Sequence, residues 1–185
     1  MLKKPSKNIA LFGGSFDPPH LGHMAVVLYL LKNYDEVWIL PNYQHAFKNQ
    51  QSPFKDRLKM CKISFKDFSK VKILDLEKNL SGYTIDTVRA LKEAYPQAKF
   101  TWILGSDLLK EVDQWKEAKT LKKLIKFEKL ARAPQMLSDF PPLSSTQVRE
   151  KAKKKESLEN LVVPTIEAYI RQKKLYQNPK TKNQP

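Results

Sequence analysis

The fold of this chain is decided by residues 9–24, which read IALFGGSFDPPHLGHM. The first four of these residues are apolar and form a run with the length of a buried strand. Gly13 and Gly14 end the run, and from Leu21 onward apolar residues recur at helical spacing. Strand, glycine turn and helix start in this order predict free backbone N–H groups and the positive end of a helix dipole at the tip of a strand. Such an arrangement binds phosphate.

Two histidines near the predicted helix start are the candidate reactive groups. His20 and His23 are three residues apart, so they can project from one side of the helix toward the same ligand. The two glycines let a ligand approach the backbone without a Cβ in the way, and Pro18 and Pro19 stiffen the turn that delivers His20. Imidazoles can donate hydrogen bonds to phosphate oxygens and stabilise the charge of a phosphoryl-transfer transition state.

Other kinds of site fit this stretch less well. A P-loop needs Gly-Lys-Ser/Thr and a dinucleotide fingerprint needs Gly-x-Gly-x-x-Gly, and the stretch has neither. A structural zinc site needs about four ligands, and one cysteine with a third histidine at position 45 gives no obvious set, so we predict no protein-bound metal. Two histidines that only pack in the core are the plain alternative.

The composition is that of one globular domain. The chain has 185 residues, of which 41% are hydrophobic, and this length suffices for one full core. No apolar run approaches the length of a membrane span, and the run at residues 9–12 is too short for a secretion signal. We therefore expect a cytoplasmic protein with no membrane part. The single cysteine, Cys61, lies on an apolar helical stripe, which predicts a buried structural thiol.

The net charge of +15 is spread along the chain, and it could reflect either a polyanionic partner or anionic substrates. Basic clusters occur at residues 116–129 and 151–155, but aromatic residues do not alternate with them as a base-stacking platform requires. This pattern favours a solvated lysine-rich surface. A basic nucleic-acid-binding module on the same fold stays open as the alternative from another functional class.

Short β-type runs alternate with helical stretches along most of the chain. This alternation, with nearly continuous apolar strands, predicts an α/β fold in which helices cover both faces of a parallel sheet. Ligands of such folds bind outside the carboxyl ends of the strands. The expected strands lie at residues 9–12, 37–40, 71–74, 100–104 and about 127–131. Helices are expected from Leu21, from Phe54, after a Thr84 cap, after a Ser145 cap, and from Pro164 in a more helical C-terminal part. We expect one domain at residues 1–176 and a disordered tail at residues 177–185.

Residues 13–23, GGSFDPPHLGH, resemble the motif of the nucleotidyltransferase superfamily that carries a His-x-Gly-His element. Within it they resemble the bacterial nicotinate-nucleotide adenylyltransferases, and further matches extend the resemblance over residues 8–176. The resemblance implies a Rossmann-like sheet. It also implies that ATP is bound by the motif residues Gly13, Gly14, Ser15, Phe16, His20 and His23.

A second match lies at residues 143–149, LSSTQVR, which resemble the family's Ile-Ser-Ser-Thr-x-Ile-Arg element. Hydroxyls and free N–H groups at a helix start, with Arg149 one turn on, suit the β- and γ-phosphates of ATP. Alone, the stretch would be an ordinary serine cap with a surface arginine. Together with the first motif, it implies catalytic roles for His20, His23 and Arg149. The ATP-binding residues implied here are Ser144, Ser145, Thr146 and Arg149.

The resemblance also implies a site for nicotinate mononucleotide between the two motifs. Asp107 follows the expected strand at residues 100–104 and matches an aspartate that contacts ribose hydroxyls in the family. Trp115 matches a tryptophan that stacks on the nicotinate ring, a use that suits an indole face. Thr84 matches a threonine that helps to bind the nicotinate carboxylate. The implied set is Lys48, Tyr83, Thr84, Asp107 and Trp115.

The chain departs from the family pattern in two places. Residues 41–48, PNYQHAFK, keep the lysine of the family's Pro-x-x-x-Pro-Pro-His-Lys stretch but not its second and third prolines or its histidine, which leaves the roles of His45 and Phe47 open. Only eleven residues separate Arg132 from Ser144. The connection at residues 133–143 is therefore expected to be shorter than in the family.

The activity implied by the resemblance is transfer of AMP from ATP to nicotinate mononucleotide, which gives deamido-NAD and pyrophosphate in NAD biosynthesis. The phosphate of the mononucleotide is already an anionic nucleophile, so catalysis rests on positioning and charge stabilisation. Mg²⁺ is expected to arrive with ATP, bound largely through phosphates and water. Rival acceptors are nicotinamide mononucleotide and phosphopantetheine. The matches at Tyr83, Thr84 and Trp115 argue against phosphopantetheine and less firmly against the amide, so the preference between acid and amide is left open. The oligomeric state is left open.

Overall fold

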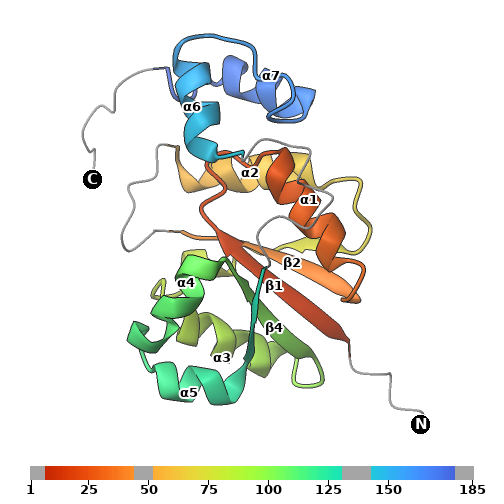
Figure 1. Ribbon diagram of the computed structural model, residues 1–185, viewed down its shortest axis with the longest axis vertical. Helices are drawn as coiled ribbons and strands as arrows, with labels where there is room; N and C mark the ends of the chain where they lie inside the picture. Colours follow the sequence, from red (N-terminus) through yellow and green to blue (C-terminus); the bar gives the residue numbers. More distant parts are fainter. Residues whose placement is uncertain (1–6, 44–51, 131–142, 178–185) are drawn as a thin grey trace.

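The computed structural model describes residues 7–43, 52–130 and 143–177. They form a parallel five-stranded sheet with helices on both faces, and two further helices lie beyond one of its helical layers (Figure 1). The strands are β1 (Asn8–Gly14), β2 (Glu36–Pro41), β3 (Val71–Ile73), β4 (Lys99–Leu104) and β5 (Lys126–Lys129). The longer helices are α1 (Leu21–Leu30), α2 (Phe54–Ser64), α3 (Thr84–Ala94), α6 (Ser145–Lys153) and α7 (Pro164–Gln172). Shorter ones are η1 (Leu76–Asn79), α4 (Ser106–Glu111), η2 (Val112–Gln114) and α5 (Ala118–Leu124).

The order of the strands creates a switch point between β1 and β4. The sheet runs β3-β2-β1-β4-β5, and every neighbouring pair is parallel. The chain first builds outward from β1 to β3 and then returns to place β4 on the other side of β1. Ligands of doubly wound sheets bind at the carboxyl ends of the strands where this reversal occurs. The motif at residues 13–23 begins at that end of β1, so the topology alone places it at the expected binding edge.

Side chains of alternate residues in the central strands pack into two separate hydrophobic cores, one on each face of the sheet. Ile9 and Leu11 of β1 pack in one core with residues of α3 and α5, whereas Ala10 packs in the other with residues of α1 and α2. Because successive strand residues point to opposite faces, a strand buried on both sides must be apolar throughout. This explains the uninterrupted apolar runs in the sequence. In Figure 1, α1 and α2 lie on one side of the sheet, and α3, α4 and α5 lie on the other.

The C-terminal helices form a third cluster against α2. Met60 of α2 is 0% exposed and packs with Val148 of α6, with Ile166 and Ile170 of α7, and with Leu158 between these helices. Figure 1 shows α6 and α7 stacked beyond α2, on the side away from the sheet. The expected helical C-terminal part is therefore present, and it packs against α2, which also packs on the sheet.

The expected elements are confirmed, with local differences. Gly13 and Gly14 are the last residues of β1, paired with β2, so they do not form the turn that the sequence predicted. Thr84 does not cap α3, since the helix begins at that residue and Tyr83 occupies the N-cap position. The cap of α6 is Ser144, whose hydroxyl accepts a hydrogen bond from the Gln147 N–H, so Ser145 is inside the helix.

Three further expectations can be compared with the structure. Pro164 is the first residue of α7, as its fixed φ and missing N–H favour. Cys61 is buried, and burial raises the pKa of its thiol, which fits a structural role. In the described part of the chain, no helix combines the length and the apolar character that crossing a bilayer requires. Of the expected tail at residues 177–185, residues 178–185 lie outside the described residues.

Candidate active site

The loop that follows β1 turns at a phenylalanine. Phe16 has a φ of 48°, in the left-handed region, whereas Gly13 and Gly14 have no such φ. The Phe16 side chain is buried, and its ring packs edge-on against Phe12 at a centroid distance of 5.5 Å. A Cβ added to Gly13 would lie 3.2 Å from the Trp102 ring, and one added to Gly14 would lie 3.3 Å from the Phe16 ring. These glycines therefore make room for aromatic rings at the end of β1.

The two histidines lie together at the N-terminus of α1. His20 is the N-cap residue and His23 is in the first turn, with ring centroids 3.8 Å apart. The backbone N–H of His20 donates to Nδ1 of His23 over 3.1 Å. A Cβ at Gly22 would lie 3.0 Å from two atoms of the His20 ring, so the missing side chain lets this ring fold against the helix start. The expected pairing of the histidines on one side of the helix is confirmed.

Both histidines are neutral at pH 7 in this structure. Burial lowers the pKa of His20 to about 4. The pKa of His23 is also well below its ordinary value, first because of burial and second because of the nearby His20. Since Nδ1 of His23 accepts a hydrogen bond, the proton of the neutral ring is on Nε2, which is therefore a donor. Nδ1 of His20 is buried and has no hydrogen-bond partner among the described residues.

The second motif docks directly on the first. The Ser145 hydroxyl donates to the Pro18 carbonyl over 2.9 Å, and Nη1 of Arg149 donates to the Asp17 carbonyl over 2.8 Å. Arg149 also donates to the hydroxyl of Thr146 over 3.0 Å. The N-termini of α1 and α6 thus meet at residues 17–20, and neither helix has an acidic residue in its first turn. Two helix starts with no carboxylate in their first turns present free N–H groups that suit phosphate groups.

A cluster of buried polar side chains holds the loop after β1 on the side that faces α2 and the end of α7. The carboxylate of Asp17, 3% exposed, accepts hydrogen bonds at Oδ1 from the hydroxyls of Ser52 (2.5 Å) and Tyr176 (2.8 Å). Arg57, 1% exposed, donates to the carbonyls of Ser15 (2.8 Å), Ser52 (3.3 Å) and Tyr43 (3.1 Å). Burial lowers the pKa of Arg57, and the charge of Asp17 partly opposes this shift. We call Asp17, Ser52, Arg57 and Tyr176 the loop-support cluster.

Three of the residues expected to bind the mononucleotide, Tyr83, Thr84 and Trp115, lie on the α3 side of the sheet. Tyr83 is 50% exposed at the start of α3, and Nζ of Lys116 lies 4.5 Å from the centre of its ring. Trp115 precedes Lys116 and is partly buried, with its ring 6.0 Å from Phe127 in an edge-on contact. The structure therefore brings Tyr83 and Thr84 close to the segment that carries Trp115.

Some expected site residues cannot be placed. Lys48, His45, Phe47 and residues 133–142 lie outside the described residues. Asp107 is in α4, directly after β4, but its side chain also lies outside what the structure describes. The end of β4 is adjacent to the end of β1 in the sheet, so the backbone of this residue is at the expected edge.

Sequence reasoning missed the loop-support cluster and Lys116. Arg57 gave a usable signal, because it is three residues after Phe54 and four before Cys61 and so falls on the apolar face of α2. Lys116 gave a weaker one as the neighbour of Trp115. Ser52 and Tyr176 gave none, since their role depends on contacts with Asp17 across 35 and 159 positions.

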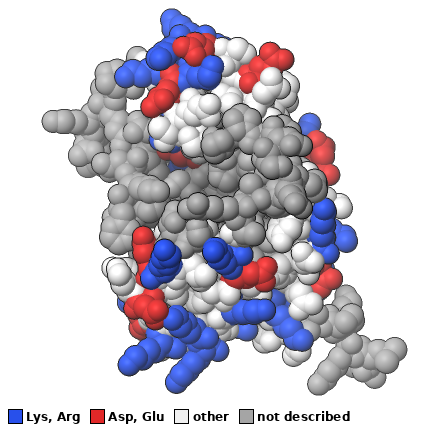
Figure 2. Space-filling model, viewed as in Figure 1, with Lys and Arg blue, Asp and Glu red and all other residues white. Residues whose placement is uncertain are grey.

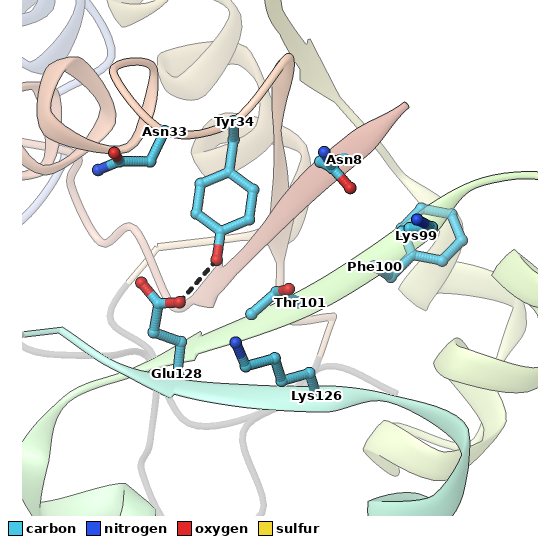
Figure 3. Close-up of a pocket in the computed structure, with 8 residues that line it drawn as sticks. All are labelled: Asn8, Asn33, Tyr34, Lys99, Phe100, Thr101, Lys126 and Glu128. Atoms are coloured by element: carbon cyan, nitrogen blue, oxygen red, sulfur yellow. Dashed lines mark hydrogen bonds between the residues drawn. The ribbon is translucent and has the colours of Figure 1, made fainter. Parts of the chain in front are cut away.

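A separate cavity lies at the opposite edge of the sheet. It measures about 480 Å³ and is bordered by Asn8, Lys99 and Lys126, which begin β1, β4 and β5 (Figure 3). Figure 3 shows Tyr34 directed toward Glu128, and its hydroxyl donates to that carboxylate over 2.9 Å. The amino ends of the strands form this cavity, so it is distinct from the region where the two motifs meet.

The surface carries basic and acidic side chains side by side. Figure 2 shows Lys and Arg interspersed with Asp and Glu, and basic side chains gather at the lower left, where Figure 1 places α5. Several are paired, as in Lys122 with Asp113 (2.5 Å) and Arg89 with Glu117 (2.7 Å). Exposed pairs of this kind contribute little to stability. The mixture fits a solvated lysine-rich surface.

The comparisons with known proteins agree with this geometry. The family model described as cytidylyltransferase-like matches residues 11–151, which include both motifs, so the chain is a nucleotidyltransferase by class. Nicotinate-nucleotide adenylyltransferase of Bacillus subtilis is 32% identical over 190 residues, covering 93% of this chain and 100% of its own length. A Myxococcus xanthus protein assigned the same activity is 36% identical over 183 residues, covering 94% of this chain and 96% of its own.

A solved structure shares the fold as well. The crystal structure of a Vibrio parahaemolyticus protein, also assigned as a nicotinate-nucleotide adenylyltransferase, superposes with a TM-score of 0.76 at 25% identity. The match covers 94% of this chain and 97% of that one. The chain belongs to the nicotinate-nucleotide adenylyltransferase family.

Proposed function

We propose that the chain transfers AMP from ATP to nicotinate mononucleotide, giving deamido-NAD and pyrophosphate in the cytoplasm. The observation that carries this proposal is the meeting of the α1 and α6 N-termini, with His20, His23 and Arg149 gathered there. The shared name of relatives that match nearly the whole chain supports the acceptor.

The proposed reaction is one in-line displacement at the α-phosphorus of ATP. An oxygen of the mononucleotide phosphate attacks this phosphorus, and the bond to the bridging oxygen of the β-phosphate breaks as pyrophosphate leaves. The attacking oxygen is already anionic, so no strong base is required. His20 and His23 donate hydrogen bonds to the triphosphate, and Nε2–H of His23 stabilises the charge that builds up at the α-phosphate. Bound phosphates also favour the protonated forms of both rings.

The second motif holds the leaving group in this proposal. The guanidinium of Arg149 has five N–H donors, and its bonds to the Asp17 carbonyl and the Thr146 hydroxyl orient it while leaving other donors for phosphate. Ser144, Ser145 and Thr146 bring hydroxyls and backbone N–H groups to the same end of α6. Gly13, Gly14, Ser15 and Phe16 form the first motif's side of the ATP site.

The acceptor binds on the α3 side. Trp115 provides an aromatic face for the pyridine ring, and Thr84 a hydroxyl for the nicotinate carboxylate. Lys116 is beside the Tyr83 ring and 3.6 Å from the Asp86 carboxylate, and we propose that its ammonium turns to the nicotinate carboxylate when the acceptor binds, which favours the acid over the amide. Asp107 and Lys48 are proposed to contact the ribose and the phosphate of the mononucleotide.

Mg²⁺ belongs to the ATP in this proposal. The ion takes oxygen ligands and keeps several waters, and it usually binds through substrate phosphates with few protein carboxylates. Asp17 is the one carboxylate of the first motif, and the hydroxyls of Ser52 and Tyr176 already bind it. When bound with ATP, the ion neutralises part of the phosphate charge.

The test is pyrophosphate release from Mg-ATP with nicotinate mononucleotide, nicotinamide mononucleotide or phosphopantetheine as the only acceptor. We expect the highest kcat/KM with nicotinate mononucleotide. Turnover with phosphopantetheine alone would overturn the proposal, and a preference for the amide would overturn the role given to Lys116. Salt-dependent RNA or DNA binding without pyrophosphate release would point instead to a nucleic-acid-binding protein.

A further inference from the structure

We propose that Tyr176, in the segment after α7, is a positioning residue for ATP. Its hydroxyl binds the Asp17 carboxylate and so fixes the loop that contacts the phosphates. This inference rests on the proposed function, because it assigns ATP to the region where α1 and α6 meet. Tyr176 itself touches Asp17 and Ser52, so it acts on the phosphate site through the first motif.

The backbone after α7 is shaped to return the chain to this motif. Lys174 has a φ of 52° and the N–H of Leu175 donates to the Ile170 carbonyl over 3.0 Å, which is the pattern of a left-handed helix end. Tyr176 is also left-handed, with a φ of 66°. Residues other than glycine adopt this region at a cost, so surrounding contacts must hold the turn in place. Leu175 and Tyr176 pack on the C-terminal core cluster and provide such contacts.

The hydroxyl of Tyr176 is fixed as a hydrogen-bond donor. Burial, followed by the charge of Asp17, raises the pKa of this phenol well above its ordinary value. A protonated hydroxyl 2.8 Å from Oδ1 of Asp17 donates to that oxygen, as does the Ser52 hydroxyl. A buried carboxylate is costly to desolvate, and hydrogen bonds to its charged form offset that cost. The loop after β1 therefore depends on these hydroxyls to keep Asp17 in place.

The position of Asp17 also determines the positions of Arg149 and Ser145, which bind the carbonyls of residues 17 and 18. The Asp17 carboxylate accepts the hydrogen bonds from Ser52 and Tyr176, while its carbonyl accepts the hydrogen bond that orients Arg149. The next residue, Pro18, accepts the hydrogen bond from Ser145, and His20 follows two residues later. A shift of the Asp17 backbone would thus move Arg149, Ser145 and His20 relative to one another. Phosphoryl transfer depends on such positioning.

The chain contains a matched control for the loss of one phenolic hydroxyl. Tyr169 in α7 donates to Oδ1 of Asp56 in α2 over 2.7 Å, so it also makes a tyrosine–carboxylate hydrogen bond between the C-terminal part and α2. Asp56 is outside both motifs. Tyr176→Phe and Tyr169→Phe therefore remove the same group from the same part of the molecule, but only the first removes it from Asp17.

The experiment measures ATP binding by calorimetry without acceptor, full kinetics with nicotinate mononucleotide, and melting temperature for the wild type and both variants. We expect Tyr176→Phe to weaken ATP binding and to lower kcat/KM for ATP by about 10-fold, the effect of about 1.4 kcal/mol. The KM for the mononucleotide should stay within about 2-fold. Tyr169→Phe should keep wild-type values for both substrates, and its own fall in melting temperature shows what the loss of one such hydroxyl does to stability alone.

Two results would overturn the inference. One is wild-type ATP binding by Tyr176→Phe, and the other is an equal loss of ATP binding in both variants, which would indicate general destabilisation. The double variant Ser52→Ala with Tyr176→Phe adds a second check, because both hydroxyls serve one carboxylate and their losses should not be additive. A wild-type protein that binds ATP but does not use nicotinate mononucleotide would refute the proposed acceptor, while calorimetry would still decide the role of Tyr176.

Discussion

At the scale of single residues, the site contains two histidines whose pKa values are lowered. His20 and His23 are neutral because burial lowers the pKa of each ring, so the unliganded protein does not hold two imidazolium charges 3.8 Å apart. Neutral rings can still donate through an N–H, and ATP brings the negative charge that makes protonation favourable. In the proposed function, these rings can therefore bind the triphosphate and take up a proton when it arrives.

Replacing His23 tests this role directly. His23→Ala removes the Nε2–H donor, and we expect kcat to fall by about 10²-fold or more, the typical effect of losing one preorganised donor. Pyrophosphate release under saturating substrates measures the change, and circular dichroism confirms that the variant is folded. Near-normal turnover by the folded variant would contradict the assignment.

The lowered pKa of His20 also makes stability depend on pH. The unfolded chain binds a proton at His20 below about pH 6.5 whereas the folded one does so only near pH 4, so the contribution is present above pH 6.5 and is lost as pH falls toward 4. Between pH 7 and pH 5 this lowers the free energy of unfolding by about 2 kcal/mol. His23 adds a loss of its own, so we expect urea unfolding to show a total loss in the wild type that is about 2 kcal/mol larger than in His20→Asn, which keeps a good N-cap residue. Equal losses would mean that His20 is not the group responsible.

At the scale of elements, the helix starts carry most of the site. The N-terminus of α1 presents the histidines, and that of α6 presents Ser145 and Arg149. Each helix is anchored by its apolar face, through Val26, Val27 and Leu30 in α1 and through Val148 and Ala152 in α6. Packing thus fixes the position of each helix, and the hydrogen bonds from Ser145 and Arg149 to residues 17 and 18 fix the two starts against each other.

A substitution at Gly22 in α1 should affect the stability of the helix and the position of the His20 ring in different ways. Gly22→Ala should favour the helix by about 0.5–1 kcal/mol from propensity alone. However, the new Cβ would be 3.0 Å from the His20 ring, which would have to shift. We expect kcat to fall by roughly 10-fold while the free energy of unfolding changes by less than about 1 kcal/mol. Unchanged turnover would show that the position of the His20 ring is not critical.

At the scale of the whole molecule, the catalytic region depends on the joint between the sheet and the C-terminal helices. Met60 on α2 is the buried contact in this joint, surrounded by residues of α6 and α7. Arg149 and Ser145 reach the first motif only if α6 is held in place by that packing.

Met60→Ala should therefore be strongly destabilising. We expect a loss of about 2–5 kcal/mol in the free energy of unfolding, the usual effect of emptying a fully packed methionine site. Urea denaturation measures it, and Met24→Ala, whose side chain is only partly buried, is the control with a smaller expected loss. A loss for Met60→Ala no greater than that of the control would mean that the joint is loosely packed.

The same three scales explain what the sequence could predict. The strands were located because residues buried on both sides must be apolar, as residues 9–12 and 37–40 are. The caps at Thr84 and Ser145 were wrong by one residue, because a cap is defined by backbone conformation and several hydroxyls competed for it. Gly13 and Gly14 were assigned to a turn because glycine often marks one, whereas here the neighbouring Trp102 and Phe16 rings require it. The meeting of the two motifs followed from the resemblance and is confirmed by hydrogen bonds.

The loop-support cluster could not be predicted in the same way. Local patterns describe neighbours within a few residues, and Tyr176 reaches Asp17 only through the folding of the entire chain. The proposed roles of Lys48 and Asp107 stay predictions, since their side chains lie outside the described residues.

The hydrogen bond between Tyr176 and Asp17 has a consequence for the order of biosynthesis. A ribosome makes Asp17 early and Tyr176 159 positions later. The loop after β1 therefore lacks the Tyr176 hydroxyl until synthesis has passed residue 176. If Tyr176 has the role proposed above, a chain that stops before residue 176 is expected to bind ATP more weakly than one that includes it.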